Sequence, residues 1–211
     1  MDEYAAMFEL SRHELDSRIL GCADGPASFN AEMHSHGRTV ISVDPIYRCS
    51  REEIRGRIDK TYPTIMEQLR QNHDDYVWGK ISSPEALGQL RMRTMDRFLV
   101  DFPQGVKEGR YLPCELPALP FTDQAFSLAV CSHFLFLYSD QLSSEFHDHS
   151  VQEMLRVARE VRVFPLLTLG RQASPHLDVI CEQLRKSGRA CEIKKVDYEF
   201  QRGGNHMLRI W

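Results

Sequence analysis

Hydrophobic residues along the 211-residue chain follow two alternating periods. Stretches rich in apolar residues at 18–20, 39–44, 126–131 and 160–169 predict strands, and the continuous apolar run at 126–131 is typical of a strand that is covered on both faces. Between these runs, apolar residues recur every three or four positions, which is the spacing of amphipathic helices. Strands that alternate with helices predict an α/β fold with a doubly wound, mostly parallel sheet and right-handed crossovers.

Residues 51–103 interrupt this alternation, because they carry two helical stripes with no strand pattern between them. Pro63 is expected to kink or split the first of these helices, and Ser83-Pro84 is a good start for the second. We therefore expect a helical insertion after the second strand, within a single domain that spans residues 1–211.

The end of the chain carries a different pattern. Residues 191–201 and 206–211 each resemble a strand, and Arg202-Gly203-Gly204-Asn205 between them is a strong hairpin signal. A terminal hairpin of this kind places one antiparallel strand in the otherwise parallel sheet.

Composition and charge exclude several classes of protein. The chain has 26 Lys+Arg and 30 Asp+Glu, with a net charge of −4, so nucleic acid is not expected as a partner. The six cysteines form no C-x-x-C pair, which favours a reducing, cytoplasmic compartment. We expect neither a signal peptide nor a membrane span, because the N-terminus has no basic region and no apolar stretch is long enough. The oligomeric state stays open.

The strongest chemical signal is a glycine-containing turn after the first predicted strand. Gly21 and Gly25 allow the backbone to approach a ligand, and the following helix directs its N–H groups to the same point. Asp44 ends the next strand, 19 residues after Gly25, where a carboxylate can accept hydrogen bonds from a ribose diol. This order predicts a nucleotide-type site; a structural turn and a strand-end acid are the alternative.

With these residues the sequence resembles the class I, seven-stranded S-adenosylmethionine-dependent methyltransferases. The stretches 19–26, 42–45 and 119–128 carry the resemblance, and the last is similar to the family's Leu-Pro-Phe segment before the fourth strand. The resemblance implies a Rossmann-like sheet, S-adenosylmethionine as cofactor, and methyl transfer to a small-molecule acceptor that the sequence does not identify. The insertion at 51–103 would then be a lid or an acceptor pocket, lined by Tyr62, Tyr76 and Trp78.

The resemblance also implies roles for single residues. Asp44 would bind the ribose hydroxyls, Glu115 the adenine amino group, and Ser132 would lie under the sulfonium. His133 is the candidate base, since histidine titrates near neutral pH, although a structural histidine in the pocket wall is the alternative. The expected cofactor-binding residues are Gly21, Cys22, Ala23, Asp24, Gly25, Asp44, Pro45, Glu115 and Ser132.

Two positions depart from the family's pattern. Ile19 stands where an acid usually helps to hold the methionine ammonium, and Ala23 replaces the second glycine. Cofactor binding would then be weak, or Asp24 would substitute for the missing acid. A binding or scaffold protein that has lost catalysis therefore stays open, as does, on weaker grounds, a nicotinamide-dependent enzyme.

Two His-x-His pairs are candidate metal ligands. His34 and His36, like His147 and His149, fall in predicted helix or helix-end sequence, where side chains at i and i+2 diverge. We therefore predict no metal site.

Overall fold

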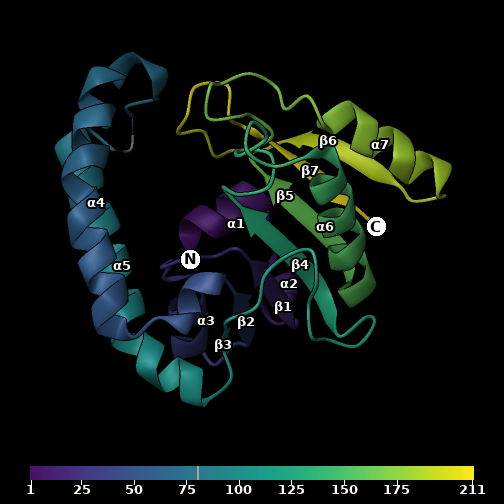
Figure 1. The fold of residues 1–211 in the computed structure, drawn as a ribbon, viewed down its shortest axis with the longest axis horizontal. Helices are drawn as coiled ribbons and strands as arrows, with labels where there is room; N and C mark the ends of the chain where they lie inside the picture. Colours follow the sequence, from purple (N-terminus) through teal and green to yellow (C-terminus); the bar gives the residue numbers. More distant parts are fainter. Residues whose placement is uncertain (80) are drawn as a thin grey trace.

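The computed structural model describes residues 1–79 and 81–211, which form one seven-stranded sheet with helices around it (Figure 1). The strands lie in the order β3-β2-β1-β4-β5-β7-β6, and β7 alone runs opposite to the other six. Their bounds are β1 (Ile19–Cys22), β2 (Val40–Val43), β3 (Tyr111–Leu112), β4 (Phe126–Ser132), β5 (Ala158–Phe164), β6 (Cys191–Lys195) and β7 (His206–Ile210). The sheet confirms the predicted arrangement with one reversed strand.

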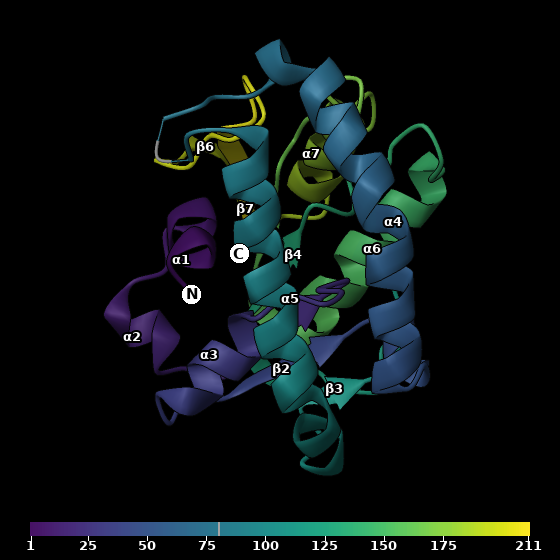
Figure 2. The ribbon, with the colours of Figure 1, turned by 90° about the vertical axis from the view of Figure 1, so that its left-hand side faces the viewer.

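Helices cover both faces of the sheet, and two further helices cross the carboxyl ends of its strands (Figure 2). One face carries α1 (Asp2–Phe8), α2 (Arg12–Leu15) and α3 (Phe29–Ser35), and the other carries α6 (Ser144–Val157) and α7 (Leu177–Lys186). The predicted helical insertion consists of α4 (Arg51–Gln71) and α5 (Pro84–Lys107), which run side by side across the carboxyl ends of the strands. Two short 3₁₀ helices, η1 (Pro45–Arg48) and η2 (His73–Asp75), flank α4.

Strand β4 shows why its sequence is a continuous apolar run. Leu128 and Val130 belong to the core on the α1–α3 side, whereas Ala129 and Cys131 belong to the core on the α6–α7 side. Because successive side chains point to opposite faces, burial of both faces requires an apolar residue at every position.

The insertion is held at its base by an aromatic cluster. Tyr47, Phe98, Phe102 and Tyr111 are buried together between η1, α5 and β3, with ring centroids 5.0–6.0 Å apart. Helix α4 continues through Pro63 to Gln71, so of the two predicted effects of this proline, a kink or a split, the split does not occur.

The far end of the insertion is held by the connection between β6 and β7. The predicted strand 191–201 is too long, because β6 ends at Lys195. A ten-residue loop then leads to His206, which is the register partner of Lys195. The backbone N–H of Val77 donates to the carbonyl of Phe200 at 2.8 Å, and Tyr76 forms an isolated bridge with Gln201. The loop thus contacts the tip of the insertion instead of extending the hairpin.

Strand β5 is also displaced from its expected range of 160–169. It begins at Ala158, directly after α6, and ends at Phe164. Pro165 follows, and its lack of an N–H group removes a donor that continued pairing would need.

Candidate functional site

The carboxylate of Asp24 lies over the backbone of Gly21, at the carboxyl end of β1. A Cβ on Gly21 would overlap the Asp24 side chain, so this position requires glycine. The Asp24 carboxylate accepts hydrogen bonds from Tyr4 Oη at 3.1 Å and from Ser42 Oγ at 2.6 Å. Burial raises its pKa to about 6, and these two hydrogen bonds oppose the rise.

Ile19 stands at the position where the family's pattern has an acid. It is fully buried among apolar side chains at the start of β1. Its side chain lies on the same face of the strand as the position of a Gly21 Cβ, because alternate residues share a face. The Asp24 carboxylate therefore lies on the same face of β1 as Ile19, two residues nearer to the carboxyl end of the strand.

Asp44 follows β2 and is fixed by two backbone donors. Its carboxylate accepts from the Gly25 N–H at 2.9 Å and from the Ile46 N–H at 2.8 Å, the latter as the cap of η1. Tyr47 donates from its hydroxyl to the Gly25 carbonyl at 2.8 Å, which ties the turn to the aromatic cluster. Burial raises the pKa of Asp44, and the nearby negative charge of Glu115 adds to the rise.

The other residues expected at the cofactor turn occupy different environments. Cys22 is fully buried in the core, so only its backbone faces the turn. Ala23 has a left-handed φ of 56°, a conformation that favours the glycine usual in the family. Pro45 is exposed at the start of η1, and the exposed Glu115 pairs with Arg48 at 3.2 Å.

Ser132 and His133 lie together at the carboxyl end of β4. Ser132 Oγ and His133 Nδ1 share a hydrogen bond of 2.8 Å, and the His133 N–H donates to the Phe164 carbonyl at 2.7 Å. The imidazole lines the cavity, and the residue as a whole is exposed to solvent. Desolvation by the surrounding protein atoms, with the positive charge of Arg91, lowers the pKa of His133, so the ring is neutral near pH 7.

A cavity of about 530 Å³ lies between these residues and the insertion. Asp24, Ser132 and His133 form part of its floor, and α4 and α5 form its roof. The structure thus brings three of the predicted site residues to one cavity, whereas Asp44 and Glu115 lie beside it, at the ends of β2 and β3.

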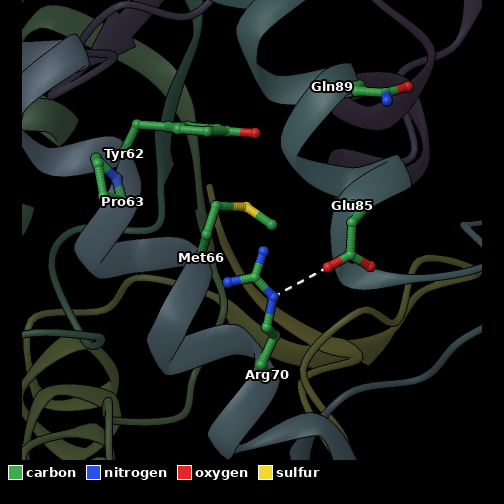
Figure 3. Close-up of a pocket in the computed structure, with 6 residues that line it drawn as sticks. All are labelled: Tyr62, Pro63, Met66, Arg70, Glu85 and Gln89. Atoms are coloured by element: carbon green, nitrogen blue, oxygen red, sulfur yellow. Dashed lines mark hydrogen bonds and ion pairs between the residues drawn. The ribbon is translucent and has the colours of Figure 1, made fainter.

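The roof contains two of the three aromatic residues that were expected to line it. Tyr62 and Tyr76 face the cavity, whereas Trp78 packs at the tip of the insertion against Phe200, with ring centroids 5.6 Å apart. A second hollow of about 340 Å³ lies between α4 and α5, where Arg70 Nε donates to Glu85 at 3.0 Å (Figure 3).

Several residues of the site carried no signal in the sequence. Tyr4 and Glu3 come from α1, Arg91 comes from α5, and Ser42 lies inside β2. An amphipathic stripe identifies Tyr4 as a buried position, but it does not indicate which distant carboxylate the hydroxyl meets. Both ring nitrogens of His147, from one of the two His-x-His pairs, bond backbone carbonyls. Within 1–79 and 81–211, no three potential ligands gather as in a metal site.

None of the helices in the described part of the chain is both long and apolar enough to cross a membrane.

Comparison with known proteins places the chain in a structural class. No family model matches its sequence. The magnesium protoporphyrin IX methyltransferase of Synechocystis PCC 6803, solved with bound SAH, aligns with 99% of this chain and 80% of its own, at 10% identity and a TM-score of 0.51. The PH0226 protein of Pyrococcus horikoshii OT3 aligns with 99% of this chain and 87% of its own, also at 10% identity and a TM-score of 0.51. The chain therefore has the class I methyltransferase fold.

A curated relative defines the family more narrowly. The uncharacterized protein MJ0045 of Methanocaldococcus jannaschii is 33% identical over 210 residues, which cover 99% of this chain and 92% of the relative. The chain belongs to the same family as MJ0045.

Proposed function

We propose that this protein is an S-adenosylmethionine-dependent methyltransferase that acts on a small-molecule acceptor. The observation that carries the proposal is the cavity under α4 and α5, with Asp24, Ser132 and His133 in its floor. Ligands of open α/β sheets bind at the carboxyl ends of the strands, and these three residues lie at the carboxyl ends of β1 and β4. The methyltransferase fold and the SAH bound in the Synechocystis enzyme support the same cofactor.

The residues beside the cavity fit an adenosyl group. A Cβ on Gly25 would meet only the Asp44 carboxylate, at 3.9 Å, so the glycine leaves open space next to this acid. The Gly25 and Ile46 N–H groups fix the carboxylate at this position, where it retains lone pairs for ribose hydroxyls. Glu115 is the nearby acceptor for an adenine amino group.

Asp24 would take the role of the missing acid at position 19. Its carboxylate lies in the cavity floor, and in the ionised form it would bind the ammonium end of the methionine moiety. The bound cofactor supplies an electrophilic methyl group, so the protein has to position the acceptor and, where needed, remove one proton.

His133 would remove that proton. Ser132 holds Nδ1, which leaves Nε2 as the nitrogen to accept a proton from the acceptor. The low pKa keeps this nitrogen unprotonated near pH 7 but also makes it a weak base, so we expect it to serve an acceptor of low pKa. Helices α4 and α5 would exclude water as a lid.

Isothermal titration calorimetry with S-adenosylhomocysteine tests the cofactor site. Asp44→Ala removes charge-assisted hydrogen bonds worth ~1.5–3 kcal/mol, so its dissociation constant should rise about tenfold to a hundredfold. Asp16→Ala is the matched control, because this exposed acid precedes β1 at the opposite edge of the sheet and pairs with Arg38. If the wild type gives no heat with S-adenosylhomocysteine or S-adenosylmethionine at high micromolar concentration, a scaffold function replaces the enzymatic one.

A further inference from the structure

The walls of the cavity are mainly apolar. Side chains of α4 and α5 form most of the roof, and two loops close one end. The apolar lining residues include Ile58, Ile65, Met66, Leu69, Leu87 and Met95. Among the described lining residues only Glu3, Asp24 and Arg91 carry formal charges near pH 7.

Arg91 is the one cation among the described residues of this wall, and Glu3 already neutralises it. Arg91 Nη1 donates to Glu3 Oε2 at 2.7 Å, and its Nη2 lies 3.5 Å from Tyr198 Oη. Tyr198 in turn donates to the other oxygen of Glu3 at 3.2 Å. An acceptor that carries a carboxylate or phosphate would have to compete with Glu3 for this guanidinium.

The remaining charge in the wall is negative. Asp24 accepts hydrogen bonds from Tyr4 and Ser42, and no lining cation pairs with it. His133 shares its Nδ1 with Ser132 and is neutral, so it adds no positive charge. The described wall therefore carries a net charge of about −1, which the net charge of +1 of bound S-adenosylmethionine would balance.

From this charge inventory we infer that the acceptor is an uncharged, mainly apolar small molecule that binds beneath α4 and α5. This inference rests on the proposed function. An anion placed here would lose its hydration without gaining an ion pair, whereas an apolar ring or chain would bury its surface against the lid. The specificity of the cavity thus comes from its described lining residues, among which no cation is available to pair with an anion.

A pair of fluorescent probes of nearly equal size separates charge from shape. The anion 1-anilinonaphthalene-8-sulfonate and its uncharged sulfonamide both brighten when they leave water. Titrated into the full-length protein, the sulfonamide should bind at least tenfold more tightly than the sulfonate. Equal or tighter binding of the sulfonate would overturn the inference.

Two lid variants locate the probe. Ile65 faces the cavity and is 50% exposed, so Ile65→Trp should fill the cavity without disturbing the core and should weaken sulfonamide binding at least tenfold. Val100 is 73% exposed on α5 and does not line the cavity, so Val100→Trp should leave binding unchanged. Sulfonamide binding that is insensitive to Ile65→Trp would place the probe elsewhere and overturn the inference.

A third variant changes the charge alone. Glu3→Gln frees Arg91, so sulfonate binding should tighten about tenfold while sulfonamide binding stays within twofold. No gain for the sulfonate would contradict the role of the Glu3–Arg91 pair. If the sulfonamide binds as expected but S-adenosylhomocysteine does not, the selectivity of the cavity stands and the proposed methyl transfer fails.

Discussion

The side chain of Asp24 occupies the space directly above Gly21, so the first glycine of the turn makes room for a carboxylate of the protein itself. The same carboxylate reaches Tyr4 of α1 and Ser42 of β2 and lines the cavity. One buried acid thus connects the first helix, two central strands and the proposed binding site.

This contact makes Gly21 sensitive to the smallest substitution. Gly21→Ala should lower the free energy of unfolding by about 1–3 kcal/mol, because the new Cβ overlaps the Asp24 carboxylate in a packed region. Gly56→Ala is the control, since Gly56 lies in α4 with no atom near its would-be Cβ. Urea denaturation should show that the control is stabilised by about 0.5–1 kcal/mol, and equal effects of the two variants would contradict the packing argument.

Asp24 should also make stability depend on pH. Its pKa is raised from 3.8 to about 6 on folding, so between these values the folded state binds the proton and the unfolded state does not. The free energy of unfolding should therefore fall as pH rises from about 4 to 6, by up to about 3 kcal/mol, and the loss should persist above pH 6.

Asp24→Asn isolates this effect from that of the other carboxyl groups. The amide is uncharged at every pH and retains an oxygen that accepts from Tyr4 or Ser42. The variant should gain stability over the wild type at pH 7.5 and little at pH 4.5, as measured by urea denaturation at both values. A difference that does not change with pH would show that the carboxyl group is not buried as described.

Asp44 should contribute to stability even without a ligand. Its carboxylate caps η1 and accepts from the Gly25 N–H, so Asp44→Ala should lower the free energy of unfolding by about 1 kcal/mol. Asp44→Asn, which keeps one acceptor oxygen, should lose less. Thermal melts of the ligand-free proteins would measure both, and an unchanged melting temperature for Asp44→Ala would contradict the capping role.

The tip of the lid should loosen when its aromatic contact is removed. Phe200 stacks on Tyr76 at 4.8 Å, and Phe200→Ala should destabilise this contact locally by about 1–3 kcal/mol. Hydrogen exchange should then accelerate around residues 72–90 but not at the base of α5. Phe146→Ala, which truncates a half-buried phenylalanine on α6, should leave exchange in the lid unchanged; equal acceleration along the whole lid would mean that its two ends are not held separately.

Much of the fold follows from local sequence patterns. The continuous apolar run at β4 requires burial of both faces, and the spacing of Gly21, Gly25 and Asp44 predicts a turn and an acid at neighbouring strand ends. The helical stripes of 51–103 likewise predict α4 and α5, since periodicity and capping act within one helix.

The same local patterns fail where distant segments compete for a residue. Residues 196–201 resemble a strand, but their backbone contacts the tip of the lid, so β6 ends at Lys195. Asp24 gave no sign that it would lie over Gly21, because its partners Tyr4 and Ser42 are 20 and 18 residues away. Arg91 and Glu3 are 88 residues apart, and only the tertiary fold brings α5 and α1 close enough for them to pair, so that the described lining of the cavity offers no free cation. Local preferences along the chain therefore predict which elements form and where their polar ends lie. The charge and shape of the cavity depend on which side chains from remote elements meet, so they follow only from the tertiary packing.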